Sequence, residues 1–204
     1  MPRRYALALA AIGAVALMGA GLAAQRLAGS EGSGRAYRGS PAPAGISLPA
    51  FTLRDESGGT VRSAELDGKV VLVTFLETQC EESCPIVARQ IGQALRRLGA
   101  SERRGVTALA FSTHPGDDTP EAARAFVRRH QVDGELHYLI GSEHELRPVW
   151  EEFEVLPALD TGDANLHSVP VRIFDASGEW VATLRPGADL SPDNLAHDLR
   201  LALG

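Results

Sequence analysis

The sequence predicts an α/β sandwich built around a mixed β-sheet. Two observations carry this prediction. Continuous runs of apolar, β-branched residues alternate along the chain with segments in which apolar residues recur at helical spacing, as in proteins whose helices cover a central sheet. The chain has 204 residues, of which 44% are apolar and 23% charged. This is enough material for one globular domain with an added tail.

Residues 1–24 are predicted to form a membrane anchor or a signal segment. Residues 5–24 carry no charge, and as a helix they would be about 30 Å long, enough to cross a bilayer core. The preceding Arg3 and Arg4 favour an N-terminus in the cytoplasm and export of the rest. The apolar run is longer than that of a usual signal peptide, which favours an uncleaved anchor. We therefore expect a protein of the cell membrane with a single N-terminal anchor and its domain on the extracytoplasmic side, periplasmic or outer.

Residues 25–45 are expected to form a flexible linker, because residues 29–45 are rich in Gly, Ser, Pro and Ala and show no apolar period. Residues 46–204 would then form the single folded domain, which we expect to be monomeric. The chain contains 20 Lys and Arg against 26 Asp and Glu, a net charge of −6. This is the wrong sign for tracking phosphates, so nucleic acid is not an expected partner.

The first half of the domain contains a hairpin, two strands and two helices. Residues 51–66 predict a hairpin with a glycine turn. Residues 69–76 and 105–111 are continuous apolar runs, typical of strands buried on both faces. A helix lies between these strands, and a second one begins at Thr119, a good N-cap that is followed by proline. The apolar stripe of the first helix consists of Val87, Ile91, Ala94, Leu95 and Leu98.

The second half continues the alternation and closes with a hairpin and a helix. The elements are a strand at 136–140, a helix from 142, a hairpin of 169–174 with 180–184, and a last helix from 191. Ser142 and Glu145 form a capping box, and Pro148 predicts a kink or a restart within that helix. The complete order is that of a thioredoxin-like (peroxiredoxin-like) sandwich with an added N-terminal β-hairpin.

The two cysteines of the chain, Cys80 and Cys84, are the first candidates for chemistry. They follow the first central strand, at the edge of an α/β sheet where binding sites gather. In a helix, residues at i and i+4 lie on one face about 6 Å apart at Cα, so both sulfurs would face one metal ion or approach a disulfide. Pro85 suits a first helical turn, where free N–H groups favour thiolate. The negative charges of Glu81 and Glu82 repel a developing thiolate but attract a cation, so they favour metal binding over a reactive thiol. The alternative to both roles is a plain structural disulfide between the two cysteines.

Two thiolates leave most metal sites incomplete, and His167 is the candidate third ligand. It ends the irregular stretch before the last hairpin. In a thioredoxin-like sheet this stretch returns beside the N-terminus of the first helix, where it would meet the cysteines. A lone histidine before a strand is more often structural, so position alone leaves both roles open.

Several short segments together carry a family resemblance. They are the strand at 69–76, the CxxxCP of 80–85, Asp118-Thr119-Pro120, Val149-Trp150, Leu166-His167-Ser168 and Ile173-Phe174-Asp175. In these segments the chain resembles the Sco/SenC family of copper-binding cytochrome c oxidase assembly proteins, over roughly residues 37–204. The resemblance implies that Cys80, Cys84 and His167 bind copper. Soft thiolates suit Cu(I), and thiolates with imidazole also hold Cu(II).

The chain departs from the family pattern near the metal ligands. Glu77 stands where the family usually has an aromatic residue, and Glu81 where proline commonly follows the first cysteine. His114 replaces an aspartate, and Arg172 occupies the stretch where an aromatic is common. The three ligands are kept, so these differences concern partner docking and redox tuning. His114 is a candidate extra ligand, although a solvated loop histidine is the simpler interpretation.

Two functions from different classes fit these residues. The resemblance implies a membrane-tethered extracytoplasmic copper metallochaperone that serves the dinuclear copper-site subunit of cytochrome c oxidase. Whether the protein is also an enzyme depends on a second function, which the resemblance allows to overlap with the first. The alternative is a thiol–disulfide oxidoreductase that reduces the oxidase's copper-site cysteines, with one of Cys80 and Cys84 attacking and the other resolving. Both methionines lie within the first 18 residues, which excludes a Met-rich copper carrier. A peroxidase of the peroxiredoxin type would need a Thr-x-x-Cys arrangement, with threonine three residues before the nucleophile. Thr78 lies only two residues before Cys80, so a peroxidase is disfavoured.

Overall fold

The computed structural model describes residues 36–155 and 169–204. The predicted membrane segment at 1–24 and the candidate ligand His167 lie outside the described residues, so both stay predictions. Within the described ranges, no helix combines the length and the apolar character needed to cross a membrane.

A six-stranded mixed sheet forms the centre of the fold. Its strands are β1 (Ser40–Pro41), β4 (Val70–Leu76), β5 (Val106–Ser112), β6 (Leu136–Leu139), β7 (Val171–Phe174) and β8 (Trp180–Leu184). They lie in the order β1-β8-β7-β4-β5-β6. The β4–β5 and β5–β6 pairs are parallel, whereas β7 pairs antiparallel with β4 and β8, and β1 antiparallel with β8. A second sheet pairs β2 (Thr52–Arg54) with β3 (Thr60–Arg62), as expected for the N-terminal hairpin.

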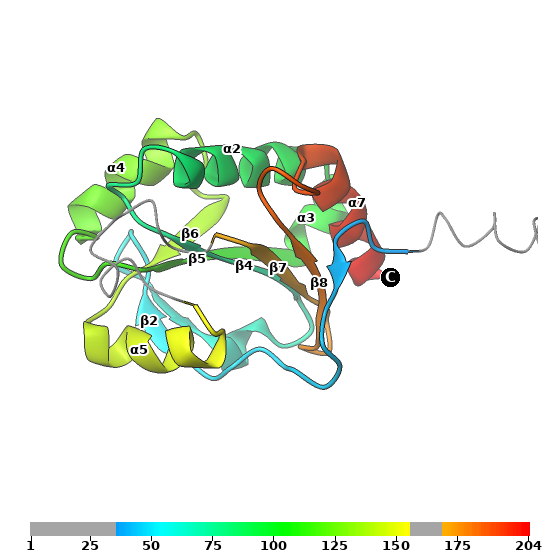
Figure 1. Cartoon of the computed structure of the whole chain (residues 1–204), viewed down its shortest axis with the longest axis horizontal. Helices are drawn as coiled ribbons and strands as arrows, with labels where there is room; N and C mark the ends of the chain where they lie inside the picture. Colours follow the sequence, from blue (N-terminus) through cyan, green and yellow to red (C-terminus); the bar gives the residue numbers. More distant parts are fainter. Residues whose placement is uncertain (1–35, 156–168) are drawn as a thin grey trace, which may run out of the picture. The chain divides into compact units, whose positions relative to one another are not determined.

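Helices cover both faces of the sheet. They are α2 (Ser83–Arg96), α3 (Ala100–Arg104), α4 (Pro120–Arg129), α5 (Glu143–Glu152) and α7 (Pro192–Leu203), with a 3₁₀ turn η1 at Ser63–Leu66. Figure 1 shows α2 and α4 on one face of the sheet, and α5 with β2 on the other. The predicted α/β sandwich of thioredoxin-like type is therefore confirmed.

Strand β4 is buried along its whole length because it lies between two packed faces. Successive side chains of a strand point to opposite faces. Val70, Leu72 and Leu76 join the apolar cluster that contains the cysteines and residues of α2, α4 and α7. Val71, Val73 and Phe75 join a second cluster with residues of β2 and α5. The continuous apolar run in the sequence thus supplies both cores at once.

The two predicted helix N-caps, Thr119 and Ser142, form the expected hydrogen bonds. Thr119 accepts from the Ala122 backbone N–H at 3.2 Å, and Ser142 and Glu145 form the reciprocal capping box. These side chains satisfy N–H groups that have no partner within the helix. Helix α5 continues through Pro148 to Glu152 and does not restart there.

The structure differs from the sequence-based expectation at the edges of the domain. The folded unit begins at Tyr37, upstream of the predicted start at 46. There the backbone N–H groups of Arg38 and Gly39 donate to the buried carboxylate of Asp198 at 2.8 and 2.9 Å. Strand β7 begins only after Pro170, which cannot donate to a sheet ladder. The short helix α3 was not expected.

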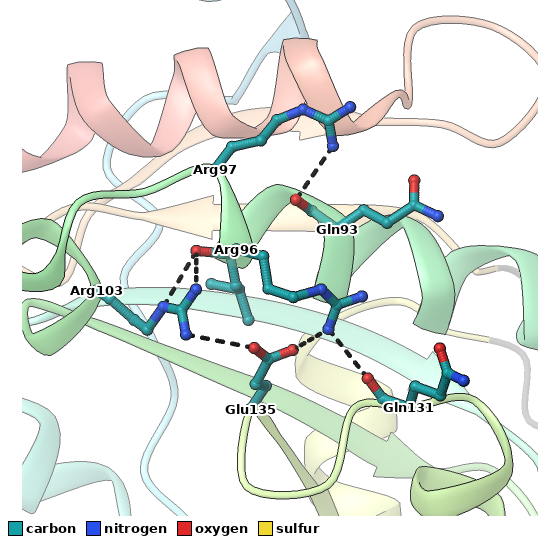
Figure 2. Close-up of polar contacts among 7 residues, drawn as sticks. Gln93, Arg96, Arg97, Arg103, Gln131 and Glu135 are labelled. Atoms are coloured by element: carbon teal, nitrogen blue, oxygen red, sulfur yellow. Dashed lines mark hydrogen bonds and ion pairs between the residues drawn. The ribbon is translucent and has the colours of Figure 1, made fainter.

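A surface ion-pair group joins α2, α3 and the segment before β6. In Figure 2, the Glu135 carboxylate lies between Arg96 and Arg103. One carboxylate oxygen is 2.5 Å from a guanidinium nitrogen of Arg96, and the other is 3.4 Å from a guanidinium nitrogen of Arg103. Arg96 also donates to the Gln131 carbonyl at 3.0 Å. The two arginine side chains are 42% and 44% exposed, and ion pairs of such partly exposed groups contribute little to stability.

Candidate functional site

The two cysteines lie at the carboxyl end of β4, where the chain turns into α2. Cys84 is the second residue of α2 and is completely buried. Cys80 precedes the helix by three residues and is 3% exposed. The expectation that both occupy one face of a helix is therefore only half right, since just Cys84 is helical. The two residues are not joined by a disulfide.

The sulfur of Cys80 acts as a cap on the start of α2. It accepts a hydrogen bond from the Cys84 backbone N–H at 3.3 Å, and the Ser83 hydroxyl lies 3.7 Å from it. The first N–H groups of a helix have no intrahelical partner and carry the positive end of the helix dipole. A negative sulfur at Cys80 is therefore favoured by this position.

The pKa values of the two thiols move in opposite directions. A hydrogen bond from the Cys84 thiol, assisted by backbone N–H groups and Ser83, lowers the pKa of Cys80 to about 5 although burial opposes the shift. Burial, followed by the interaction with Cys80, raises the pKa of Cys84. The pair consists of one thiolate at Cys80 and one thiol at Cys84 over the physiological range.

We expect the thiolate absorbance of the reduced, metal-free protein to titrate with a midpoint near pH 5. Because the pKa of Cys80 is about 5, most of the thiol is ionised above pH 5 and the thiolate is lost below it. An ordinary cysteine, with a pKa of about 8.5, would ionise only at much higher pH. The check is an ultraviolet pH titration of the wild type and of Cys84→Ala. Without the Cys84 thiol the midpoint should move upward, and a wild-type midpoint near 8 would contradict the assignment.

Asp118 fixes the loop that carries Cys80. Its buried carboxylate accepts from the Thr78 backbone N–H at 2.7 Å, the Ser112 hydroxyl at 2.6 Å and the Tyr138 hydroxyl at 3.1 Å. These donors belong to the loop after β4, to the end of β5 and to β6. Burial raises the pKa of Asp118, and the three donors oppose that shift. In the sequence, Asp118 is recognisable only as part of a short motif. Its role as a shared acceptor depends on how β4, β5 and β6 align, which the sequence does not show.

Two of the positions where the chain departs from the family pattern meet beside this loop. Glu77 is 3% exposed, and burial raises its pKa to about 7, with the charges of Asp118 and Cys80 adding to the shift and His114 opposing it. His114 Nδ1 lies 3.2 Å from an Asp117 carboxylate oxygen. His114 is three-quarters buried, which does not fit a solvated loop histidine.

Arg172, a third departure, is buried on β7 among aromatic rings. Its guanidinium carbon lies 4.9 Å from the ring centroid of Trp180, 5.3 Å from that of Phe153 and 5.7 Å from that of Phe75. Cation–π attraction accounts for a charge in this place. Burial lowers the pKa of Arg172 to about 10, so it stays protonated at neutral pH.

The described chain resumes two residues after His167. Val169 is buried in the same apolar cluster as Cys80 and Cys84. The cysteines are thus the members of the predicted ligand set that the structure describes, and His167 as the third ligand stays a prediction.

The fold and this site together define a class of protein, a thioredoxin-like domain with a thiol pair at the end of its first central strand. The model of the SCO1/SenC family matches residues 41–204. The chain belongs to the SCO1/SenC family.

Relatives of known sequence or structure agree with this assignment. A SCO2-like protein of Rickettsia typhi is 25% identical over 138 residues, 65% of this chain and 66% of that protein; the match thus spans just under two thirds of its length. ScoI of Bradyrhizobium japonicum, solved with copper bound, is 28% identical with a TM-score of 0.64, over 76% of this chain and 98% of that one. BsSco, a member of the Sco family of cytochrome c oxidase assembly proteins with a disulfide switch, is 23% identical with a TM-score of 0.66 and shares the fold, over 80% of this chain and 97% of that one.

Proposed function

We propose that the protein is an extracytoplasmic copper metallochaperone for cytochrome c oxidase assembly, tethered to the membrane by residues 1–24. Copper is its cargo, held by Cys80, Cys84 and His167 and passed to the copper-site subunit of the oxidase. The observation that carries the proposal is the pair of cysteine sulfurs at the start of α2, where the pKa of Cys80 is lowered to about 5. Such a site offers a ready thiolate, which is the ligand form that Cu(I) prefers.

The second sulfur makes copper capture dependent on pH. Since burial raises the pKa of Cys84, a metal ion that takes both sulfurs must displace the Cys84 proton. Metal binding that releases a proton weakens as the pH falls. Capture and release of the cargo at this site would therefore both respond to pH.

Family membership supports copper as the cargo. ScoI of Bradyrhizobium japonicum, which is 28% identical to this chain, is a relative solved with copper bound. Cys80 and Cys84 supply the soft donors of the predicted set, and His167 would supply an imidazole that extends binding to Cu(II).

A second candidate function is thiol–disulfide exchange, and the opposite pKa shifts of the two cysteines favour it. Cys80 thiolate would attack a disulfide of the oxidase copper site and form a mixed disulfide, which releases one target thiolate. Cys84, after losing its proton, would attack the Cys80 sulfur and release the second target thiolate. The target disulfide is reduced to a dithiol, and the protein ends with a Cys80–Cys84 disulfide.

Copper titration of wild type and His167→Ala, run beside a dithiol exchange assay, separates the two functions. The reduced wild type should bind one Cu(I) per chain, and His167→Ala should weaken Cu(II) binding at the cysteine site at least about tenfold. His144→Ala is the matched control, because His144 is an exposed residue of α5. Unchanged Cu(I) and Cu(II) affinities in His167→Ala would contradict the ligand assignment. Disulfide reduction that persists in His167→Ala while copper binding is lost would favour the oxidoreductase.

A further inference from the structure

A second group of metal-ligand side chains lies at the same edge of the sheet as the cysteines. Glu77, His114 and Asp117 each place a donor atom within 4.8 Å of the others. Glu77 directly follows β4, and His114 and Asp117 belong to the loop after β5. Strands β4 and β5 are parallel and in register to their last residues, Leu76 and Ser112. Their carboxyl ends therefore bring these side chains together.

The carboxylate of Glu77 is buried and, among the described residues, lacks a partner for one of its oxygens, which a bound cation would supply. The residue is 3% exposed, and its Oε2 atom is buried without a hydrogen-bond partner within the part of the chain that the structure describes. Burying a polar atom without a partner costs free energy, and nearly all such atoms in native proteins are satisfied. The other carboxylate at this edge does not share the problem, because Asp118 accepts from Thr78, Ser112 and Tyr138.

The remaining two ligands are arranged for access from solvent. The His114 side chain is 25% exposed and that of Asp117 is 54% exposed. The Asp117 and Asp118 backbone N–H groups donate to the His114 carbonyl at 3.1 and 3.0 Å, and this tight turn holds Asp117 beside the imidazole. A cation would therefore approach from the Asp117 side and meet the buried Glu77 at the inner end.

We propose that Glu77, His114 and Asp117 bind a divalent transition-metal cation, of the class of Zn²⁺ and Cu²⁺, at a site separate from the two cysteines. One imidazole and two carboxylates are a common ligand set for such ions. Ligand atoms on one tetrahedral Zn²⁺ lie about 3.4 Å apart. His114 Nδ1 and an Asp117 carboxylate oxygen are already 3.2 Å apart, and the Glu77 oxygen lies within 4.8 Å of both. The site uses none of Cys80, Cys84 and His167, so it stands independently of the proposed function.

The donor types distinguish this site from the cysteine pair. Thiolates select Cu(I), whereas imidazole and carboxylate favour divalent ions. A protein with both sets would hold a divalent ion through nitrogen and oxygen a few residues from the sulfur site.

Cobalt titration tests the proposal, because Co²⁺ bound to thiolate shows an intense sulfur-to-metal charge-transfer band and Co²⁺ bound to nitrogen and oxygen does not. The background is the full chain carrying Cys80→Ser and Cys84→Ser. This protein should bind one Co²⁺ per chain with visible d–d absorption and no charge-transfer band. Adding Glu77→Gln or His114→Gln should weaken Co²⁺ and Zn²⁺ binding at least tenfold.

Matched controls replace exposed residues of the same type. Glu81→Gln and His144→Gln, in the same background, should leave Co²⁺ affinity within twofold of the parent. Zn²⁺ should also raise the thermal midpoint of the parent and not that of Glu77→Gln. Should Glu77→Gln fold poorly, His114→Gln carries the test, since its side chain reaches solvent.

Three results would overturn the proposal. The first is Co²⁺ binding that disappears with the two cysteines, which would place the ion at the sulfurs. The second is Co²⁺ affinity unchanged in both Glu77→Gln and His114→Gln. The third is loss of binding in His137→Gln with retention in His114→Gln, which would assign the ion to Asp55, Glu56 and His137, another group with donor atoms within 4.8 Å of one another.

Discussion

Replacing Cys80 with serine is expected to weaken Cu(I) binding by the reduced protein more than about a hundredfold. Loss of an outer residue that only supports a ligand already costs 10–100-fold in metal affinity, and Cys80 is proposed as a ligand itself. The serine hydroxyl is a hard donor that remains protonated, so it does not replace a soft thiolate. Cys84→Ser should produce a loss of similar size. The measurement is competition with a Cu(I) chelator of known affinity.

Ser83→Ala provides the matched control for this loss. The Ser83 hydroxyl lies 3.7 Å from the Cys80 sulfur and assists in lowering its pKa, but it is not a proposed ligand. Cu(I) affinity should therefore fall by about tenfold in this variant, the lower end of the range for a residue that supports a ligand. Wild-type affinity in both cysteine variants would show that copper binds elsewhere. A loss in Ser83→Ala as large as that in Cys80→Ser would show that the effect comes from the loop and not from the ligand.

The central elements were predictable because each has a strong local signal. The run at 69–76 became β4, and Thr119 and Ser142 became N-caps with the expected partners. Strand β1 is different. Its two residues lie in a segment of linker-like composition, and what orders that segment is Asp198 on α7, which is far away in sequence. A buried aspartate on a helix stripe gives no indication, from sequence alone, of which backbone N–H groups will satisfy it.

The candidate site was predictable to the same extent. The spacing of Cys80 and Cys84 identifies a sulfur pair, but not that one sulfur caps the helix while the other lies within it. Glu77 was visible only as an unusual residue at the end of an apolar strand. Its position beside His114 depends on the register of β4 against β5. Neither strand carries that register in its own sequence.

Asp118→Ala is expected to lower the free energy of unfolding by about 3 kcal/mol. The variant removes the acceptor of three donors, and each buried donor left without a partner costs about 1–3 kcal/mol. Part of this cost is offset, because burial raises the pKa of Asp118 and the variant no longer buries that carboxylate. For a domain of this size, 3 kcal/mol corresponds to a fall of about 6–12 °C in the thermal midpoint. Chemical denaturation in metal-free buffer measures the change.

Two neighbouring variants separate the hydrogen-bond role of Asp118 from a general effect of the loop. Asp118→Asn keeps the size and one carbonyl acceptor, and the Ser112 and Tyr138 hydroxyls can rotate to accept from its amide, so we expect roughly half of the loss. Asp117→Ala changes a side chain that is 54% exposed, and without metal its effect should stay within about 0.5 kcal/mol. If Asp118→Ala were no more destabilising than Asp117→Ala, the loop of Cys80 would be held by its own backbone. If Asp118→Ala also raised the midpoint of the Cys80 titration, the Thr78 hydrogen bond would be what places that sulfur at the start of α2.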